Sequence, residues 1–528
     1  MKKHLALALA VMTAFAVPAW ADITPGETED SYVVSEEVTW TSPDIAVKQL
    51  TIEAGAKLNI GGYSDNVILG QNAVIDGTGT LNGTPDGVAD LHGIKEISDI
   101  TIDASSATGK TTNIQIGAAQ SGATSGDVTL TMTNVRANED VMTTSKKHYL
   151  KVAPQFVREN TTSSLSSAKI VVNNSVIGHS LFGGALAIGS NTYDLSIENS
   201  EIVIEGHSAI GRSVYAGGGV WGKNCKTHVE NARVVVKGGD ITGAEALGTN
   251  FDTGLKPTEA GYIYGGGLVE GNDVTGSSAT VGHVEIVIEG GSLTGIRGGG
   301  RFEDEDSVPA DNPMTVSDVD IKIVGDAGLS AIGEGGVTAG GAYAKHDADQ
   351  ANDSVSSTVT AATVTLENIE SAISTVPFSG EGAASADVVL NNVKGDLGSF
   401  SDFDEIAVDA NTSVTLDSFT AKENVAPKLR LTGDWTGKDA AADVISIRND
   451  DLSGFELVTD EAKGLESAEI VDGKLVIEAT PGEQQEPDPE SKPDPETPQH
   501  HSSGGGCSAG FGALALLAAL PLLRMRKK

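Results

Sequence analysis

One ten-residue pattern recurs four times in the middle of this 528-residue chain, at 197–206, 229–238, 281–290 and 316–325. Each copy begins with an aliphatic residue and carries Asn, His or Asp two positions later. It then ends with two alternating aliphatic residues and a glycine. Alternation of this kind puts one strand face in a core and the other in solvent. The pattern therefore predicts a strand that closes in a glycine turn.

The aliphatic pairs of the four copies are expected to lie on one buried face, at Ile202/Ile204, Val234/Val236, Ile286/Ile288 and Ile321/Ile323. Weaker copies end in Asn174, Asn368 and Asn392, and Asn is the residue after Gly that best tolerates a left-handed turn. Glycine runs at 217–219, 265–267 and 298–300 follow several copies. We expect these runs to let backbones approach closely at a corner.

The spacing of the copies predicts a solenoid. The closing glycines lie 32, 52 and 35 residues apart, which fits a constant strand core with loops of different length on one face. No sustained helical period appears between the two ends of the chain. We therefore predict an all-β, right-handed parallel β-helix over residues 22–400. Residues 401–480 are less repetitive and are expected to form either the last rungs or a small β cap over the open end.

Two stretches near the start of the body alternate in the same way, at 50–60 and 72–82. Together with the later copies, they resemble the repeats of bacterial pectin-lyase-like β-helices and of adhesin or autotransporter passengers. The resemblance extends over roughly residues 38–400.

The first 21 residues predict an export signal. Lys2 and Lys3 precede an apolar run at 5–17, and Ala19-Trp20-Ala21 has the small-x-small form of a cleavage site. Cleavage after Ala21 would leave Asp22 at the mature N-terminus. The alternative is a short membrane anchor, but this run is too short to span about 30 Å of hydrocarbon.

The last residues of the chain predict attachment to a surface. Residues 481–503 are rich in Pro, Glu and Asp and are expected to form a disordered, extended, acidic linker. They lead to a small-residue site with a thiol, an apolar run at 511–523 that is expected to be helical, and a basic end. The small-residue site consists of Gly504, Gly505, Gly506 and Cys507. The segment 504–528 is either a plain tail anchor or a sorting signal that is processed.

Residues 502–528 resemble the Synerg-CTERM sorting domain and are similar to the Cys-containing MYXO-CTERM type. The resemblance implies a bacterium with a cell envelope and an envelope sorting protease as partner. It also implies that Cys507 is the processed residue or carries a lipid. The protein would then cross the inner membrane and be anchored at the cell envelope or outer surface.

The charge and cysteine content of the chain limit the classes of partner and of cross-link that we expect. The formal net charge of −38 argues against nucleic acid, because neutralising phosphates requires Lys and Arg. Cys225 and Cys507 are the only cysteines, so the chain has no disulfide framework.

A calcium-binding loop is one interpretation of the densest acidic cluster, which contains Glu303, Asp304, Glu305 and Asp306. The other interpretation is a solvated loop between rungs. No other cofactor is predicted. Asp76 lies in a Val-Ile-Asp-Gly-Thr-Gly turn that resembles one common in β-helix glycosidases, which need a second acid at about 5–10 Å. The turn alone also explains Asp-Gly at this position. His179, His207, His228 and His283 occupy different frame positions, so no metal site is predicted from them.

The sequence favours an exported, cell-surface-anchored protein that acts in adhesion or surface structure without catalysis. Its ligand would be an unknown glycan or protein, bound by loops near 243–261 and 302–313, where the spacing expands. A passive envelope-layer component is a related possibility. The alternative from another class is a surface polysaccharide lyase or glycoside hydrolase on the same fold.

Overall fold

The computed structural model describes most of the body of the chain. The described residues are 23–28, 30–39, 48–60, 67–77, 80–83, 88–103, 112–119, 124–137, 148–157, 160–189, 192–242, 261–271, 274–304, 314–345, 354–356, 359–438, 444–448 and 450–482. Contacts divide the chain into two units, 1–482 and 483–528, and every described residue belongs to the first. The predictions for Ala21, Gly504, Gly505, Gly506 and Cys507 lie outside the described residues.

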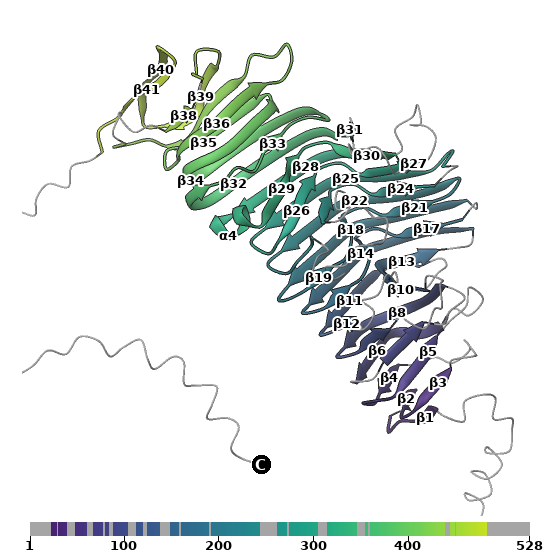
Figure 1. Ribbon diagram of the computed structural model, residues 1–528. Helices are drawn as coiled ribbons and strands as arrows, with labels where there is room; N and C mark the ends of the chain where they lie inside the picture. Colours follow the sequence, from purple (N-terminus) through teal and green to yellow (C-terminus); the bar gives the residue numbers. More distant parts are fainter. Residues whose placement is uncertain are drawn as a thin grey trace, which may run out of the picture. The chain divides into compact units, whose positions relative to one another are not determined.

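The described body is an all-β fold in which most strands pair in parallel with the strand one turn later (Figure 1). One rung illustrates the plan. It runs through β18 (Tyr193–Glu205), β19 (Ala209–Ile210), β20 (Val214–Tyr215) and β21 (Gly219–Trp221) before β22 (Cys225–Val236) starts the next rung. Parallel pairing of β18 with β22 along nearly their whole length shows that the chain repeats a coil. The coarse prediction of an all-β parallel repeat fold is confirmed.

Three stacks of strands make up the central rungs. The long-strand stack contains β14 (Thr161–Asn173), β18, β22, β25 (Ser278–Ile288), β28 (Val316–Val324), β32 (Val359–Ile373) and β34 (Ala383–Phe403). The second stack contains β16 (Leu181–Phe182), β20, β23 (Tyr262–Tyr264), β26 (Leu293–Arg297), β29 (Ile332–Thr338) and β33 (Phe378–Ser379). The third contains β17 (Leu186–Ile188), β21, β24 (Leu268–Glu270), β27 (Arg301–Asp304) and β30 (Gly341–Lys345).

The rungs before these comprise β2 (Ser31–Val34), β3 (Glu37–Thr39), β4 (Gln49–Ile52), β5 (Lys57–Ile60), β6 (Val67–Gly77), β7 (Thr80–Gly83), β8 (Val88–Ser98), β9 (Thr101–Asp103), β10 (Thr112–Ala119), β11 (Asp127–Thr133), β12 (Arg136–Ala137) and β13 (His148–Val157). β15 (Val176–Ile177) lies between β14 and β16 and pairs with β19. β1 (Ile23–Pro25) pairs antiparallel with β2, and β31 (Ser354–Ser356) pairs antiparallel with β30. α4 (Gly325–Ser330) is a helix of six residues. Within the described residues, no helix has both the length and the apolar character needed to cross a membrane.

The predicted aliphatic ladder is confirmed. Ile202 lies in register with Val234, which aligns with Ile286 and then Ile321, and all four are buried. The second aliphatic residues of the four copies, Ile204, Val236, Ile288 and Ile323, align in the same way. The opposite face carries charge, as predicted. Lys169, Glu201, Arg233 and Glu285 form a chain of ion pairs at 2.6, 2.9 and 2.7 Å.

The turn prediction is correct at two of the four closing glycines and wrong at the others. Gly206 and Gly325 have positive φ, of 65° and 69°. In the other two copies a second glycine follows, and this one, Gly239 or Gly291, takes the positive φ. The tandem glycines therefore place the turn one residue later than expected. The predicted asparagine turns are confirmed at Asn174, Asn368 and Asn392, and Asn392 Nδ2 donates to Asn368 Oδ1 at 3.1 Å.

The glycine runs form a corner where the coil is pinched. A Cβ placed on Gly265 or Gly298 would overlap a carbonyl oxygen of the next rung, and would lie 3.0 and 3.1 Å, respectively, from a valine of the long-strand stack. The predicted close approach of backbones is thus confirmed. The pinch separates a main core, which includes Val214, from a second buried cluster that includes Val220.

Residues 401–480 contain further parallel strands and one antiparallel hairpin. Parallel rungs continue through β35 (Glu405–Asp409), β36 (Ser413–Ala421), β37 (Lys428–Asp434), β38 (Ile445–Ile447) and β39 (Glu456–Lys463). An antiparallel hairpin of β40 (Leu465–Val471) and β41 (Lys474–Ala479) follows. Leu465, Ala468, Ile470 and Leu475 of this hairpin pack against the main core.

Candidate functional site

A third hydrophobic cluster lies on the faces of the second and third stacks that point away from the two cores. Val214 belongs to the main core, whereas its neighbour Tyr215 belongs to this third cluster. We call it the outer aromatic cluster. Together with the cations and the carboxylate that contact its rings, it consists of Lys151, Phe182, Tyr215, Trp221, Tyr262, Tyr264, Glu270, Arg297 and Arg301.

The rings of the outer aromatic cluster stack from rung to rung. Phe182, Tyr215 and Tyr264 are successive, nearly parallel rings with centroid separations of 4.9 and 4.9 Å. The register of β16, β20 and β23 places them one above another. Trp221 packs its ring edge to face with Phe182 at 5.8 Å. Such stacking stabilises adjacent rungs, and the three stacked rings are themselves buried.

Cations border these rings. Lys151 Nζ lies 4.3 Å from the Trp221 ring centroid, and the Arg297 guanidinium lies 5.5 Å from that of Tyr262. Arg301 is fully buried and donates to the Tyr264 hydroxyl at 3.0 Å. Cation–π contacts of this kind gain strength where water is excluded. Positive charge therefore collects at one place on a strongly acidic chain.

Trp221 forms the partly exposed part of the cluster. Its Nε1 donates to Glu270 Oε2 at 2.7 Å, so the indole lies between a carboxylate and the Lys151 ammonium. All three side chains are partly exposed. An aromatic face with a fixed acceptor and a cation beside it is suited to holding a polar ligand that has an apolar side.

The histidines singled out in the sequence do not converge. His179 is buried, and its Nδ1 lies 3.0 Å from Ser180 Oγ. Burial, reinforced by Lys151 and Arg212, holds the pKa of His179 well below its usual value, so the ring is neutral at neutral pH. His228 contacts Glu230 and Thr280. Among the described residues, no three His, Cys, Asp or Glu side chains are grouped so as to hold a metal ion.

The predicted calcium cluster is only partly described. Glu303 and Asp304 are the last two residues of β27, and Glu303 is in register with Glu270 on β24. Glu305 and Asp306 lie outside the described residues, as do the loop residues 243–260 and 307–313. Calcium binding therefore stays a prediction.

Asp76 joins two rungs. Its Oδ1 accepts a hydrogen bond from Thr51 Oγ1 at 2.6 Å, and its Oδ2 accepts one from Gln49 Nε2 at 3.1 Å. Both donors come from β4, the strand that pairs with the end of β6. These contacts account for Asp76 as a residue that holds successive rungs together.

An acidic group that the sequence did not reveal lies on the late rungs. Asp387 on β34 is in register with Glu405 on β35, and both oxygens of Glu405 accept hydrogen bonds from Arg430. Burial, together with the negative charges of Glu405 and Asp404, raises the pKa of Asp387. Register alone brings these residues together, and no motif marks them in the sequence.

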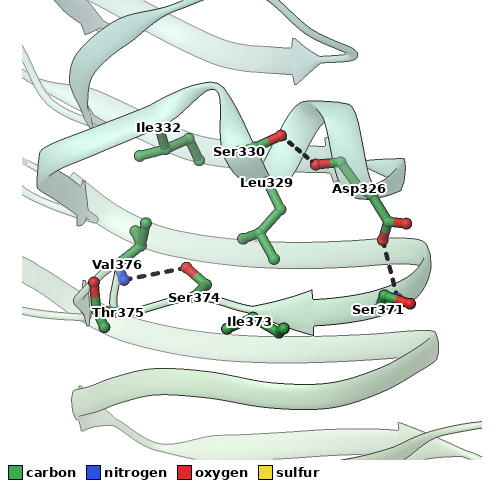
Figure 2. Close-up of a pocket in the computed structure, with 9 residues that line it drawn as sticks. All are labelled: Asp326, Leu329, Ser330, Ile332, Ser371, Ile373, Ser374, Thr375 and Val376. Carbon is green, nitrogen blue, oxygen red and sulfur yellow. Dashed lines mark hydrogen bonds between the residues drawn. The ribbon is translucent and has the colours of Figure 1, made fainter.

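A pocket of about 420 Å³ opens between helix α4 and the residues that follow the next asparagine turn (Figure 2). Leu329 and Ile332 line the helix side, and Ile373, Ser374 and Val376 line the other (Figure 2). Asp326 ties the two sides together, because its Oδ1 accepts the backbone N–H groups of residues 370 and 371 at 3.0 and 3.2 Å. We call this the α4 pocket.

Comparison with known proteins adds no family to these observations. No protein-family model matches the chain, and no curated protein or solved structure matches it either.

Proposed function

We propose that this protein is an exported, cell-surface-anchored β-helix that acts in adhesion or surface structure and binds a glycan or protein without changing it chemically. The outer aromatic cluster is the observation that supports this best. It presents Trp221, Lys151 and Glu270, all partly exposed, on regular rungs. Indole, ammonium and carboxylate together recognise ligands that have both an apolar face and polar groups.

The remaining features fit a tethered body of this kind. The coil is right-handed, and the β40–β41 hairpin acts as a cap that keeps the last rung from pairing with other chains. The signal at 1–21 directs export, and the acidic linker at 481–503 holds the body away from the membrane. An envelope sorting protease processes the segment 504–528 at or near Cys507, with or without a lipid on that thiol.

Binding is tested with the full chain on immobilised glycans and cell-surface proteins. We expect at least one ligand to be retained unchanged. The Trp221→Ala variant should lose most of that binding, because it removes the ring between Lys151 and Glu270. Lys226→Ala, which changes an exposed residue of the neighbouring strand β22, is the matched control and should bind as well as the unaltered chain. Full retention by Trp221→Ala would count against the outer aromatic cluster.

A surface polysaccharide lyase or glycoside hydrolase is the second candidate function. The raised pKa of Asp387 beside Glu405 favours it, because a carboxyl that holds its proton to higher pH than usual is better suited to serve as a general acid. Calcium at residues 303–306 would belong to this alternative. Release of unsaturated or reducing sugars from a polysaccharide panel, lost in Asp387→Asn, would establish it and overturn the adhesion proposal.

A further inference from the structure

The α4 pocket is a feature of one rung rather than of the repeat. After Gly325 the chain forms helix α4 between β28 and β29, where the earlier rung has only the short strand β19. Leu329 and Ile332 are nearly buried and form an apolar base. The following rung passes below as an extended connection from Ser374 to Pro377 (Figure 2). Because helix α4 is bulkier than the connection beneath it, the surfaces of the helix and of the connection leave a hollow between them.

The hollow is rich in hydrogen-bonding groups with fixed positions. Asp326 Oδ1 is held by two backbone N–H groups, which orients the carboxylate and leaves Oδ2 as an acceptor. Ser374 Oγ accepts the N–H of Val376 at 3.1 Å and keeps its own proton to donate. In the described part of the chain, Ser371 and Thr375 also line this pocket. Hydrogen-bond acceptors and donors therefore lie side by side in the α4 pocket.

An exposed aliphatic side chain lies among these polar groups. Ile373 is 93% exposed, far more than Val425 at 40%, Val471 at 45% and Val476 at 44%. It lines the same pocket as Asp326 and Ser374 (Figure 2). Covering an isoleucine removes apolar surface from water and so favours binding. The site thus combines one apolar contact with a carboxylate acceptor and several hydroxyls.

The charge at this site selects against anions. Asp326 carries a negative charge, and Glu370 lies next to Ser371, with Lys394 paired to it at 2.9 Å. The chain as a whole is strongly acidic. A ligand suited to the α4 pocket is therefore not an anion, donates hydrogen bonds to a carboxylate, and has one apolar face. A pyranose ring has these properties, since its hydroxyls lie at the edge and its C–H groups form the faces.

We propose that the α4 pocket binds one neutral pyranose unit, with Ile373 against a ring face and Asp326 Oδ2 accepting from ring hydroxyls. The pocket volume of about 420 Å³ lies within the range of small-molecule sites and accommodates one sugar ring. The inference concerns a different surface from the outer aromatic cluster and does not depend on the function proposed for that cluster.

Saturation-transfer NMR on the full chain tests this with defined probes. The neutral probes are the methyl glycosides of glucose, galactose and mannose, together with N-acetylglucosamine, and galacturonate is the anionic probe. We expect saturable binding of at least one neutral probe. Ile373→Ser and Asp326→Asn should each weaken it roughly two- to tenfold. Val476→Ser, which removes another exposed apolar side chain from the β40–β41 hairpin, should leave it unchanged.

Three results would overturn the proposal. They are the absence of binding by every neutral probe, equal binding of galacturonate, and unchanged affinity in Ile373→Ser. The Ile373 variant decides the matter even if Asp326→Asn disturbs the turn, because a side chain that is 93% exposed supports little of the fold. Trp221→Ala should bind these probes normally, which separates failure of this site from failure of the outer aromatic cluster.

Discussion

At the residue scale, Asp387 makes a definite prediction about pH. Burial and two neighbouring carboxylates raise its pKa in the folded protein, so the folded state holds this proton more tightly than the unfolded chain does. The stability that protonation adds is complete below the unfolded pKa of about 3.9 and is lost as the pH rises through the folded value. Asp387→Asn removes the repulsion, and thermal unfolding should show a higher Tm than the unaltered chain at pH 7.

The difference in Tm between Asp387→Asn and the unaltered chain should shrink as the pH falls through the raised pKa of Asp387, because protonation removes the same charge that the substitution removes. Asp194→Asn is the control, because Asp194 is an exposed carboxyl on the strand face of β18. A lower Tm for Asp387→Asn at pH 7 would show that the carboxylate is favourably bound instead.

A second residue-scale prediction concerns Cys225. Burial raises the pKa of this thiol to about 11, and its backbone N–H is bonded to Ser277 Oγ at 2.9 Å. Since the thiolate is the reactive form, the folded chain should resist iodoacetamide at pH 8. A Cys507→Ser variant isolates Cys225, and mass spectrometry should find alkylation only after denaturant is added. Rapid modification of the folded variant would contradict the buried placement.

At the element scale, the glycine runs at the corner of the coil separate the main core from the second buried cluster. A Cβ on Gly298 would overlap the carbonyl oxygen of Ala339, and backbone there has little room to shift. Gly298→Ala should therefore destabilise the fold by about 1–3 kcal/mol, seen as a lower denaturant midpoint. Gly454→Ala is the matched control, since no other atom lies within 4 Å of its added Cβ. Equal midpoints for the two variants would show that the corner is loosely packed.

The same corner shows how far the sequence predicts this fold. The aliphatic ladder was predictable because a period of two sets which side chains share a face, and the copies have equal length through that strand. The outer aromatic cluster was not predicted. Its stacked rings, Phe182, Tyr215 and Tyr264, stand one residue before Gly183, two before Gly217 and one before Gly265. That signal was visible, but whether the position faces a core or the outside depends on the bend at the corner.

Other parts depend on contacts between residues that lie on different rungs and far apart in the sequence, which local patterns do not contain. The pairing of Asp387 with Glu405 is set by the register of β34 and β35. The α4 pocket exists because a helix lies above an extended connection in the next rung (Figure 2). Tandem glycines moved two turns by one residue, since either glycine accepts positive φ and packing chooses between them.

At the scale of the whole molecule, each rung contacts mainly the rungs beside it, so stability adds up along the coil from neighbour to neighbour. Such a body offers repeated surfaces on a fixed frame, and it carries the two distinct sites described above. In the function that we propose, an export signal precedes this body and a processed anchor follows it. Anchoring is the part on which adhesion or a structural role at the cell surface depends.

The most direct test is the intact mass of the protein isolated from its native envelope. The account predicts a chain that begins at Asp22 and lacks the residues after the Gly504–Cys507 site, or carries a lipid on Cys507. Cys507→Ser should then be retained unprocessed or released from the envelope. A native protein that keeps an unmodified Cys507 and an intact Lys528 end would contradict the account.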